Sequence, residues 1–118
     1  MCSKSTLNEI TSKVVHAAKE CLGDKLDKVF LYGSYARGDS YNDSDIDILV
    51  LANIPREDAR KVYKNIWLIA GNLDLEHNVL VSIHVTDCAT FYQYANDLPF
   101  YMNVLKDGVE LSRIERRC

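Results

Sequence analysis

The sequence has no run of apolar residues near the length of about 20 that a membrane-spanning helix needs. It also has no C-x-x-C pair and no histidine at zinc-ligand spacing, because the four cysteines (Cys2, Cys21, Cys88 and Cys118) are widely scattered. The N-terminal residues lack the uninterrupted apolar segment of a secretion signal. We therefore expect reduced thiols, no membrane partner and a cytoplasmic protein.

An excess of positive charge is also missing. The chain has 14 Lys and Arg against 17 Asp and Glu, a formal net charge of −3, which excludes a general attraction to polyanions and predicts no extended nucleic-acid binding. Its 118 residues, 47% hydrophobic and 26% charged, are enough for one packed core. No repeat or linker divides them. We expect a single domain over residues 1–118 and leave a homo-oligomer open.

Hydrophobic periodicity predicts the secondary structure. Helical spacing predicts helices over 6–22, 56–73, 90–96 and 99–106, and β-forming residues predict strands over 28–32, 45–51 and 79–85. This order indicates an α/β (α+β) fold, with a small mixed sheet that helices cover on one face and leave open on the other. In the last strand Val81 and Ile83 alternate with Ser82 and His84, so the first pair should face the core.

Two polar motifs stand at the ends of the first two strands. The first strand ends in Gly33-Ser34, where the glycine lets a phosphate approach the backbone and the following amides and the Ser34 hydroxyl can donate to its oxygens. The second strand opens with Asp45-Ile46-Asp47, which projects two carboxylates from one face. Mg²⁺ is usually held by one or two carboxylates together with substrate phosphates. The two motifs therefore predict a phosphate-and-metal site.

Simpler readings exist for each of these residues. Two acids at a strand end are often only solvated, and a Gly-Ser turn is often only a turn; the combination of the two motifs favours function. Arg37 lies in the intervening loop, and the sequence favours an ion pair with Asp39 and a contact with phosphate equally for this residue. A histidine on a strand, such as His84, is more typical of packing than of catalysis.

The motifs resemble a known family. Residues 33–38 (GSYARG) and 44–50 (SDIDILV) are similar to the signature of minimal nucleotidyltransferases of the DNA polymerase β superfamily. Residues 98–101 (LPFY) together with 108–111 (GVEL) are similar to the ending of its stand-alone bacterial members. The resemblance implies a polymerase-β-like nucleotidyltransferase fold and transfer of AMP from ATP to an acceptor. It assigns nucleotide binding to Gly33, Ser34, Arg37 and Ser44, and both catalysis and Mg²⁺ ligation to Asp45 and Asp47.

The resemblance also implies a partner and reveals a gap. Small members resemble the antitoxin of a toxin–antitoxin pair whose partner, an all-helical HEPN toxin, can be the acceptor. Active members carry a third carboxylate on the next strand, but residues 79–85 contain no acid. Ser82 is the position best placed to match it, and Glu76, just before the strand, is the second candidate.

A hydroxyl is neutral and a very weak base at pH 7, so Ser82 is a poor substitute for that acid. The alternative prediction is a catalytically impaired nucleotide-binding module that neutralises its partner by direct contact. A third reading, modification of a small molecule such as an aminoglycoside, is less favoured, because such enzymes usually carry an additional helical domain.

Overall fold

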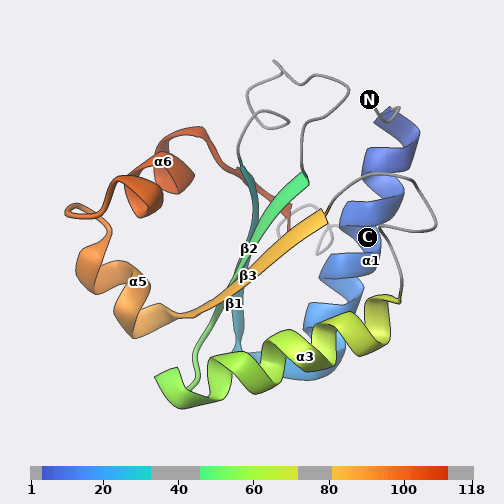
Figure 1. Ribbon diagram of the computed structural model, residues 1–118, viewed down its shortest axis with the longest axis horizontal. Coiled ribbons are helices and arrows are strands. Elements are labelled where there is room, and N and C mark those ends of the chain that lie inside the picture. Colours follow the sequence, from blue (N-terminus) through green and yellow to red (C-terminus); the bar gives the residue numbers. More distant parts are fainter. Residues whose placement is uncertain (1–3, 33–45, 72–80, 112–118) are drawn as a thin grey trace.

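The computed structural model describes residues 4–32, 46–71 and 81–111. Within these ranges the chain forms four helices and four strands (Figure 1). In chain order they are α1 (Lys4–Leu22), β1 (Leu26–Tyr32), β2 (Ile46–Ala52), α3 (Ala59–Ala70), β3 (Val81–Asp87), α5 (Cys88–Tyr94), α6 (Pro99–Asp107) and β4 (Val109–Glu110). This arrangement confirms the α/β class expected from the sequence.

The four strands form one mixed sheet in the order β3-β2-β1-β4. Strand β1 runs antiparallel to both β2 and β4, whereas β2 and β3 are parallel. Because side chains alternate along a strand, the three longer strands present two faces. We call the side that carries Ile48 the first face and the side that carries Asp47 the second face.

The first face holds the larger core. Helices α1 and α3 pack against each other and against this face, where Val14 of α1 and Ile66 of α3 are completely buried. The sheet contributes β-branched and leucine side chains, namely Val29, Leu31, Ile46, Ile48, Val50, Val81 and Ile83. Burial of apolar area on this scale is the main favourable contribution to folding.

The second face differs from the expectation that it would be open. Helices α5 and α6 lie on the opposite side of the sheet from α1 and α3 (Figure 1). Phe91 of α5 and Val104 of α6 form a smaller core with Phe30, Leu49 and Leu51 of the sheet. The sequence-based prediction of helices on one face only was therefore wrong in this detail, because these short helices also need to bury their large apolar side chains.

Element boundaries also differ from the predicted ones, as the ends of α3 and of β3 show. Residues Arg56–Asp58 form a 3₁₀ turn before α3, which ends at Gly71, where φ is +85°. A positive φ suits glycine and ends the helix; residues 72 and 73, predicted as helical, lie outside the described part of the chain. Strand β3 extends to Asp87, whose carboxylate accepts a hydrogen bond of 2.9 Å from the Thr90 amide and caps α5.

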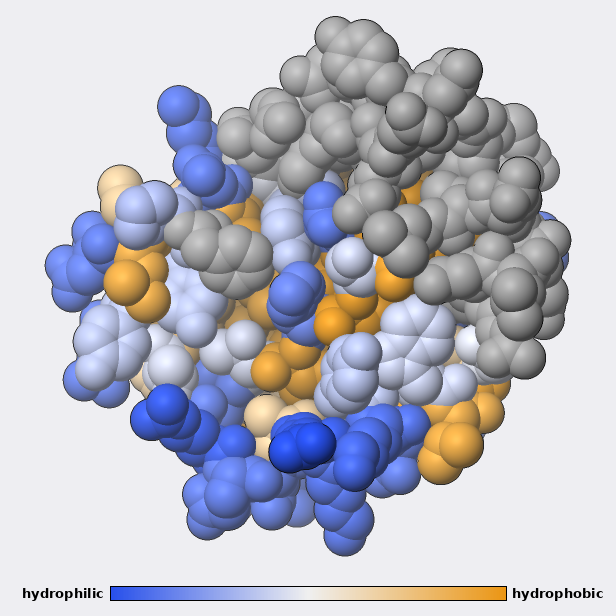
Figure 2. Space-filling view, viewed as in Figure 1, coloured by the Kyte–Doolittle hydropathy of each residue, from blue (hydrophilic) through white to orange (hydrophobic). Residues whose placement is uncertain are grey.

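The surface around α3 is charged. Figure 2 shows hydrophilic residues along the lower edge of the molecule, where α3 lies in Figure 1. They include the exposed side chains of Arg56, Glu57, Arg60, Lys61 and Lys64. Among the described residues, no helix is both long and apolar enough to cross a membrane.

Candidate functional site

Asp47 lies at the beginning of β2 and projects from the second face. On one side it pairs in register with Tyr32 of β1, and on the other with Ser82 of β3. Neighbouring strands are about 4.8 Å apart, so the three side chains form one row across the sheet. Each of the three is half-buried. The row therefore places a carboxylate, a phenol and a hydroxyl side by side, with part of each accessible to solvent.

His84 extends this row along β3. It is exposed, lies two residues after Ser82 and pairs in register with Leu49 of β2. The buried Val81 and Ile83 point to the first face, so the alternation predicted for this strand is confirmed. The prediction that a histidine here would be a packing residue is not supported, because its side chain is exposed at the second face.

The Tyr32 and His84 rings approach each other across the central strand. Their centroids are 6.4 Å apart and their planes are inclined by 49°. Burial is the main cause that raises the pKa of the Tyr32 phenol above its ordinary value, and the Asp47 carboxylate raises it further. Tyr32 therefore stays a neutral phenol at physiological pH and can donate a hydrogen bond.

Sequence reasoning identified Asp47 and Ser82 but did not single out Tyr32. Its place in the row follows from the antiparallel pairing of β1 with β2, which residue periodicity alone does not reveal. The position of Tyr32 directly before the Gly33-Ser34 motif was the available signal. A tyrosine that ends a strand beside a candidate phosphate turn lies at the same end of the sheet as that turn.

All the other predicted site residues lie outside the described part of the chain. These are Gly33, Ser34, Arg37, Ser44, Asp45 and Glu76. The proposed pairing of Asp45 with Asp47 and the alternative role of Glu76 therefore stay predictions.

The described residues fit a cation site in part. No group of three or more His, Cys, Asp or Glu side chains gathers within residues 4–32, 46–71 and 81–111. Asp47 supplies one half-buried carboxylate, and Ser82 next to it supplies a neutral oxygen. Mg²⁺ accepts such oxygen ligands and keeps several positions for water and phosphate. A cation at this row would depend on Asp47 and on further ligands from nucleotide or neighbouring loops.

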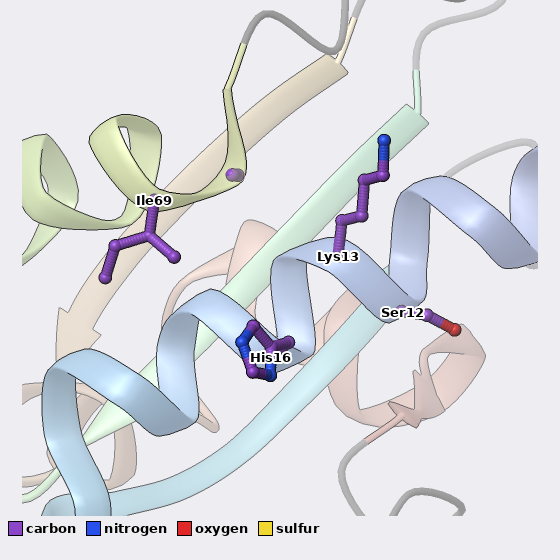
Figure 3. Close-up of a pocket in the computed structure, with 5 residues that line it drawn as sticks. Ser12, Lys13, His16 and Ile69 are labelled. Carbon is purple, nitrogen blue, oxygen red and sulfur yellow. The ribbon is translucent and has the colours of Figure 1, made fainter.

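A groove of about 510 Å³ lies away from this row, between α1 and α3 (Figure 3). It is lined by Ser12, Lys13, His16, Ile69 and Ala70. His16 is exposed, and its Nε2 atom lies 3.8 Å from Oε1 of Glu20 on the next turn of α1. Because α1 and α3 cover the first face, the sheet separates this groove from Asp47. The groove is therefore not part of the Asp47 row.

A second polar cluster lies at the other end of the second face. The Tyr92 hydroxyl of α5 donates to the Asp27 carboxylate at 2.8 Å and accepts from the Lys28 ammonium at 3.0 Å. Burial, and then the charge of Asp27, raise the pKa of the nearby Cys88 thiol to about 11, so this cysteine stays protonated near neutral pH. These contacts connect α5 to β1 and give the cluster a structural role.

Comparison with known proteins gives the site its context. Residues 12–111 match the family model described as nucleotidyltransferase domain. Two relatives from Methanocaldococcus jannaschii, MJ0141 and MJ0604, share the name "Putative protein adenylyltransferase". MJ0141 is 43% identical over 52% of this chain and 60% of its own length, and MJ0604 is 31% identical over 80% of this chain and 86% of its own. The match to a further relative of that name, MJ1305, spans only 44% of its length.

Two solved structures share the fold. A toxin–antitoxin complex with AMP-PNP aligns with a TM-score of 0.51 and 21% identity, over 86% of this chain and 71% of the other. A complex of a tri-AMPylated HEPN toxin of Shewanella oneidensis with its MNT antitoxin aligns with a TM-score of 0.50 and 16% identity, over 93% of this chain and 76% of the other. At these identities the alignments establish the fold alone.

Proposed function

The chain belongs to the nucleotidyltransferase domain family, and on that premise we propose that it transfers AMP from Mg²⁺-bound ATP to a hydroxyl group of a partner protein. The observation that carries the proposal is the position of Asp47. It is a half-buried carboxylate at the accessible end of the second face, directly after the segment that bears the predicted phosphate motif. Relatives named as protein adenylyltransferases support AMP as the transferred group.

In the proposed reaction, the acceptor hydroxyl oxygen attacks the α-phosphorus of ATP. The bond from that phosphorus to the oxygen that bridges to the β-phosphate breaks, pyrophosphate leaves, and the hydroxyl proton passes to a base or to water. A bound Mg²⁺ would neutralise charge that develops on the phosphate oxygens. Asp47 would hold the cation together with Asp45, and Gly33, Ser34, Arg37 and Ser44 would bind the triphosphate.

The residues around Asp47 would help to position the phosphate and would not bind it directly. The neutral Tyr32 phenol can donate a hydrogen bond beside the carboxylate, and the body of its ring would limit the access of water from that side. Ser82 can accept or donate a weak hydrogen bond but cannot remove a proton effectively at pH 7. The described row thus supplies one carboxylate, Asp47, and the hydroxyl in register with it is not an effective base.

The partner in this proposal is a helical protein of the HEPN type. It is motivated by a fold neighbour solved as an MNT antitoxin with a tri-AMPylated HEPN toxin. We propose that residues 1–118 act as one domain in this pair.

A second function is favoured by one specific observation. Ser82 stands in register with Asp47, which supports the interpretation that a hydroxyl occupies the position proposed for the third carboxylate. With a hydroxyl there, nucleotide binding is expected to survive better than catalysis. The chain would then be a nucleotide-binding module that neutralises its partner by contact alone.

Intact-mass measurement separates the two functions. A purified helical protein of the HEPN type is incubated with the chain, ATP and Mg²⁺, and its mass is compared with that in a sample containing EDTA. Transfer predicts a gain of one or more AMP groups, which Asp47→Asn abolishes and the matched surface variant Asp58→Asn preserves. A stable complex with no mass gain supports the binding module. No ATP binding and no complex would overturn both.

A further inference from the structure

The second face carries one more side chain that is able to bind a cation, the imidazole of His84. Its orientation follows from the contact between its ring and that of Tyr32. His84 lies on β3, the edge strand, and Tyr32 lies on β1, with β2 between them. Strands two apart are separated by roughly 10 Å, yet the two ring centroids are only 6.4 Å apart. The rings therefore lean toward each other over β2 instead of standing upright or pointing away from the sheet.

This lean brings the imidazole toward Asp47. The two residues lie on the same face of adjacent parallel strands, offset by two positions, because His84 pairs with Leu49 and Asp47 pairs with Ser82. Their Cα atoms are thus separated by about 4.8 Å across the strands and about 7 Å along them. Ligands of one cation at about 2.1 Å each can bridge side chains at this separation. His84 is also exposed, so solvent and ions can reach its ring nitrogens.

The chemistry of the row then decides which cation is favoured. Ser82 offers a neutral oxygen where a carboxylate would attract Mg²⁺, a cation that strongly prefers oxygen ligands. Imidazole nitrogen instead favours first-row transition metal ions, whose affinity for nitrogen sites rises from Mn²⁺ through Co²⁺. A row with a single carboxylate, a neutral hydroxyl and an imidazole nearby should therefore favour those ions more than an all-oxygen site does.

We propose that His84 supplies a nitrogen ligand to a divalent cation shared with Asp47, and that the site consequently binds Mn²⁺ or Co²⁺ more tightly than Mg²⁺. This inference rests on the proposed function only in placing a cation at Asp47. It concerns the identity of the cation, and it gives His84 a role that the relatives' names and the family match do not assign.

The test uses electron spin-echo envelope modulation of the full chain with Mn²⁺, alone and with AMP-PNP. A directly bound imidazole gives a nitrogen coupling that changes when the protein histidines are labelled with ¹⁵N, whereas adenine nitrogen stays ¹⁴N. We expect this labelled coupling in the wild type and in the control His16→Gln, whose histidine lies on α1. We expect it to vanish in His84→Phe, which retains a ring beside Tyr32.

Calorimetry adds an affinity readout. His84→Phe should weaken Mn²⁺ binding at least about tenfold, in the range that loss of a metal-supporting side chain costs, and change Mg²⁺ binding by less than about twofold. Wild-type protein without labelled nitrogen coupling would overturn the inference, as would coupling that persists in His84→Phe. If the wild-type protein in either case still binds Mg²⁺-ATP and modifies its partner, the proposed function is retained and only the role of His84 is lost. Absence of any Asp47-dependent cation binding would overturn the proposed function as well.

Discussion

The two faces of the sheet are made by alternate residues of the same strands, and they differ in what covers them. On the first face, α1 and α3 bury an almost entirely apolar surface. On the second face, α5 and α6 cover Phe30, Leu49 and Leu51 but leave the row of Tyr32, Asp47 and Ser82 half-buried. A polar row can persist there because its groups keep access to water, which avoids the cost of removing a carboxylate completely from water.

Adjacent residues of β2 show the division most directly. Ile48 is completely buried in the first-face core, and Asp47, one residue earlier, points to the second face. Stability and proposed chemistry therefore depend on neighbouring positions with opposite orientations. Substitutions at these two positions should therefore have separable effects on stability and on nucleotide binding.

The largest effect is expected from Ile48→Ala. Removing a fully buried isoleucine side chain from a packed core lowers the free energy of unfolding by about 2–5 kcal/mol. Urea denaturation followed by circular dichroism measures this loss. Calorimetry at a temperature where the variant stays folded should give a Mg²⁺-ATP affinity within about twofold of the wild type, because Ile48 points away from the second face. A twofold change in affinity corresponds to less than about 0.5 kcal/mol. A much larger loss of affinity in folded protein would show that the faces are not independent.

Asp47→Asn should give the reverse result. Asparagine is nearly isosteric and the position is half-buried, so the free energy of unfolding should change by no more than about 0.5 kcal/mol. Loss of the anionic ligand should reduce Mg²⁺-dependent ATP binding and AMP transfer by a factor of about 100 or more. The measurements are calorimetry with and without EDTA and the intact mass of the partner. Unchanged Mg²⁺-dependent affinity would remove Asp47 from the site.

Ser82→Asp tests the missing acid, with an intermediate effect. Ser82 is in register with Asp47 on the neighbouring strand, so an aspartate there would place a second carboxylate beside it. We expect Mg²⁺ binding and AMP transfer to rise by about tenfold, because the added charge can hold a cation and accept the hydroxyl proton. Thr86→Asp, further along the same face of β3, is the matched control and should give no gain. Equal activity of Ser82→Asp and the wild type would make Glu76 the better candidate for the third ligand.

Local sequence patterns were sufficient to predict the faces of the strands. The alternation of Val81, Ser82, Ile83 and His84 is confirmed because one face of β3 must be buried and a strand has a period of two. The pattern that predicted a carboxylate on the accessible face of β2 is supported at Asp47. The family was also identified correctly from the motifs at 33–38 and 44–50.

What the sequence could not predict depends on contacts between distant segments. The cover on the second face comes from Phe91 and Val104, single residues on short helices whose spacing does not reveal which side of the sheet they pack on. The short strand β4 depends on pairing with β1, since Phe30 pairs with Glu110 across the chain. The approach of Tyr32 to His84 likewise follows from strand order, which local periodicity does not encode.

The smallest effect is expected at the other end of the second face, from Tyr92→Phe. The substitution keeps the edge-to-face contact between this ring and Phe91, at a centroid distance of 5.3 Å. It removes the hydroxyl that donates to Asp27 and accepts from Lys28. Because these groups are largely exposed, the free energy of unfolding should fall by less than about 1 kcal/mol at pH 7.

The pH dependence of that loss follows from Lys28. The hydrogen bond to Tyr92 is the main cause that raises the pKa of the Lys28 ammonium in the folded protein. A group with a raised folded-state pKa contributes its full stability below its unfolded pKa, here about 10.5, and loses it as the pH rises through the folded value. Urea denaturation should therefore show the difference between Tyr92→Phe and wild type at pH 7 and a smaller difference above pH 10.5.

The Mg²⁺-ATP affinity of Tyr92→Phe should not change, because Lys28 and Tyr32 lie at opposite ends of β1 and only Tyr32 adjoins Asp47. A loss of affinity in Tyr92→Phe would mean that the two ends of the second face act together, and that α5 supports the Asp47 row as well as the smaller core.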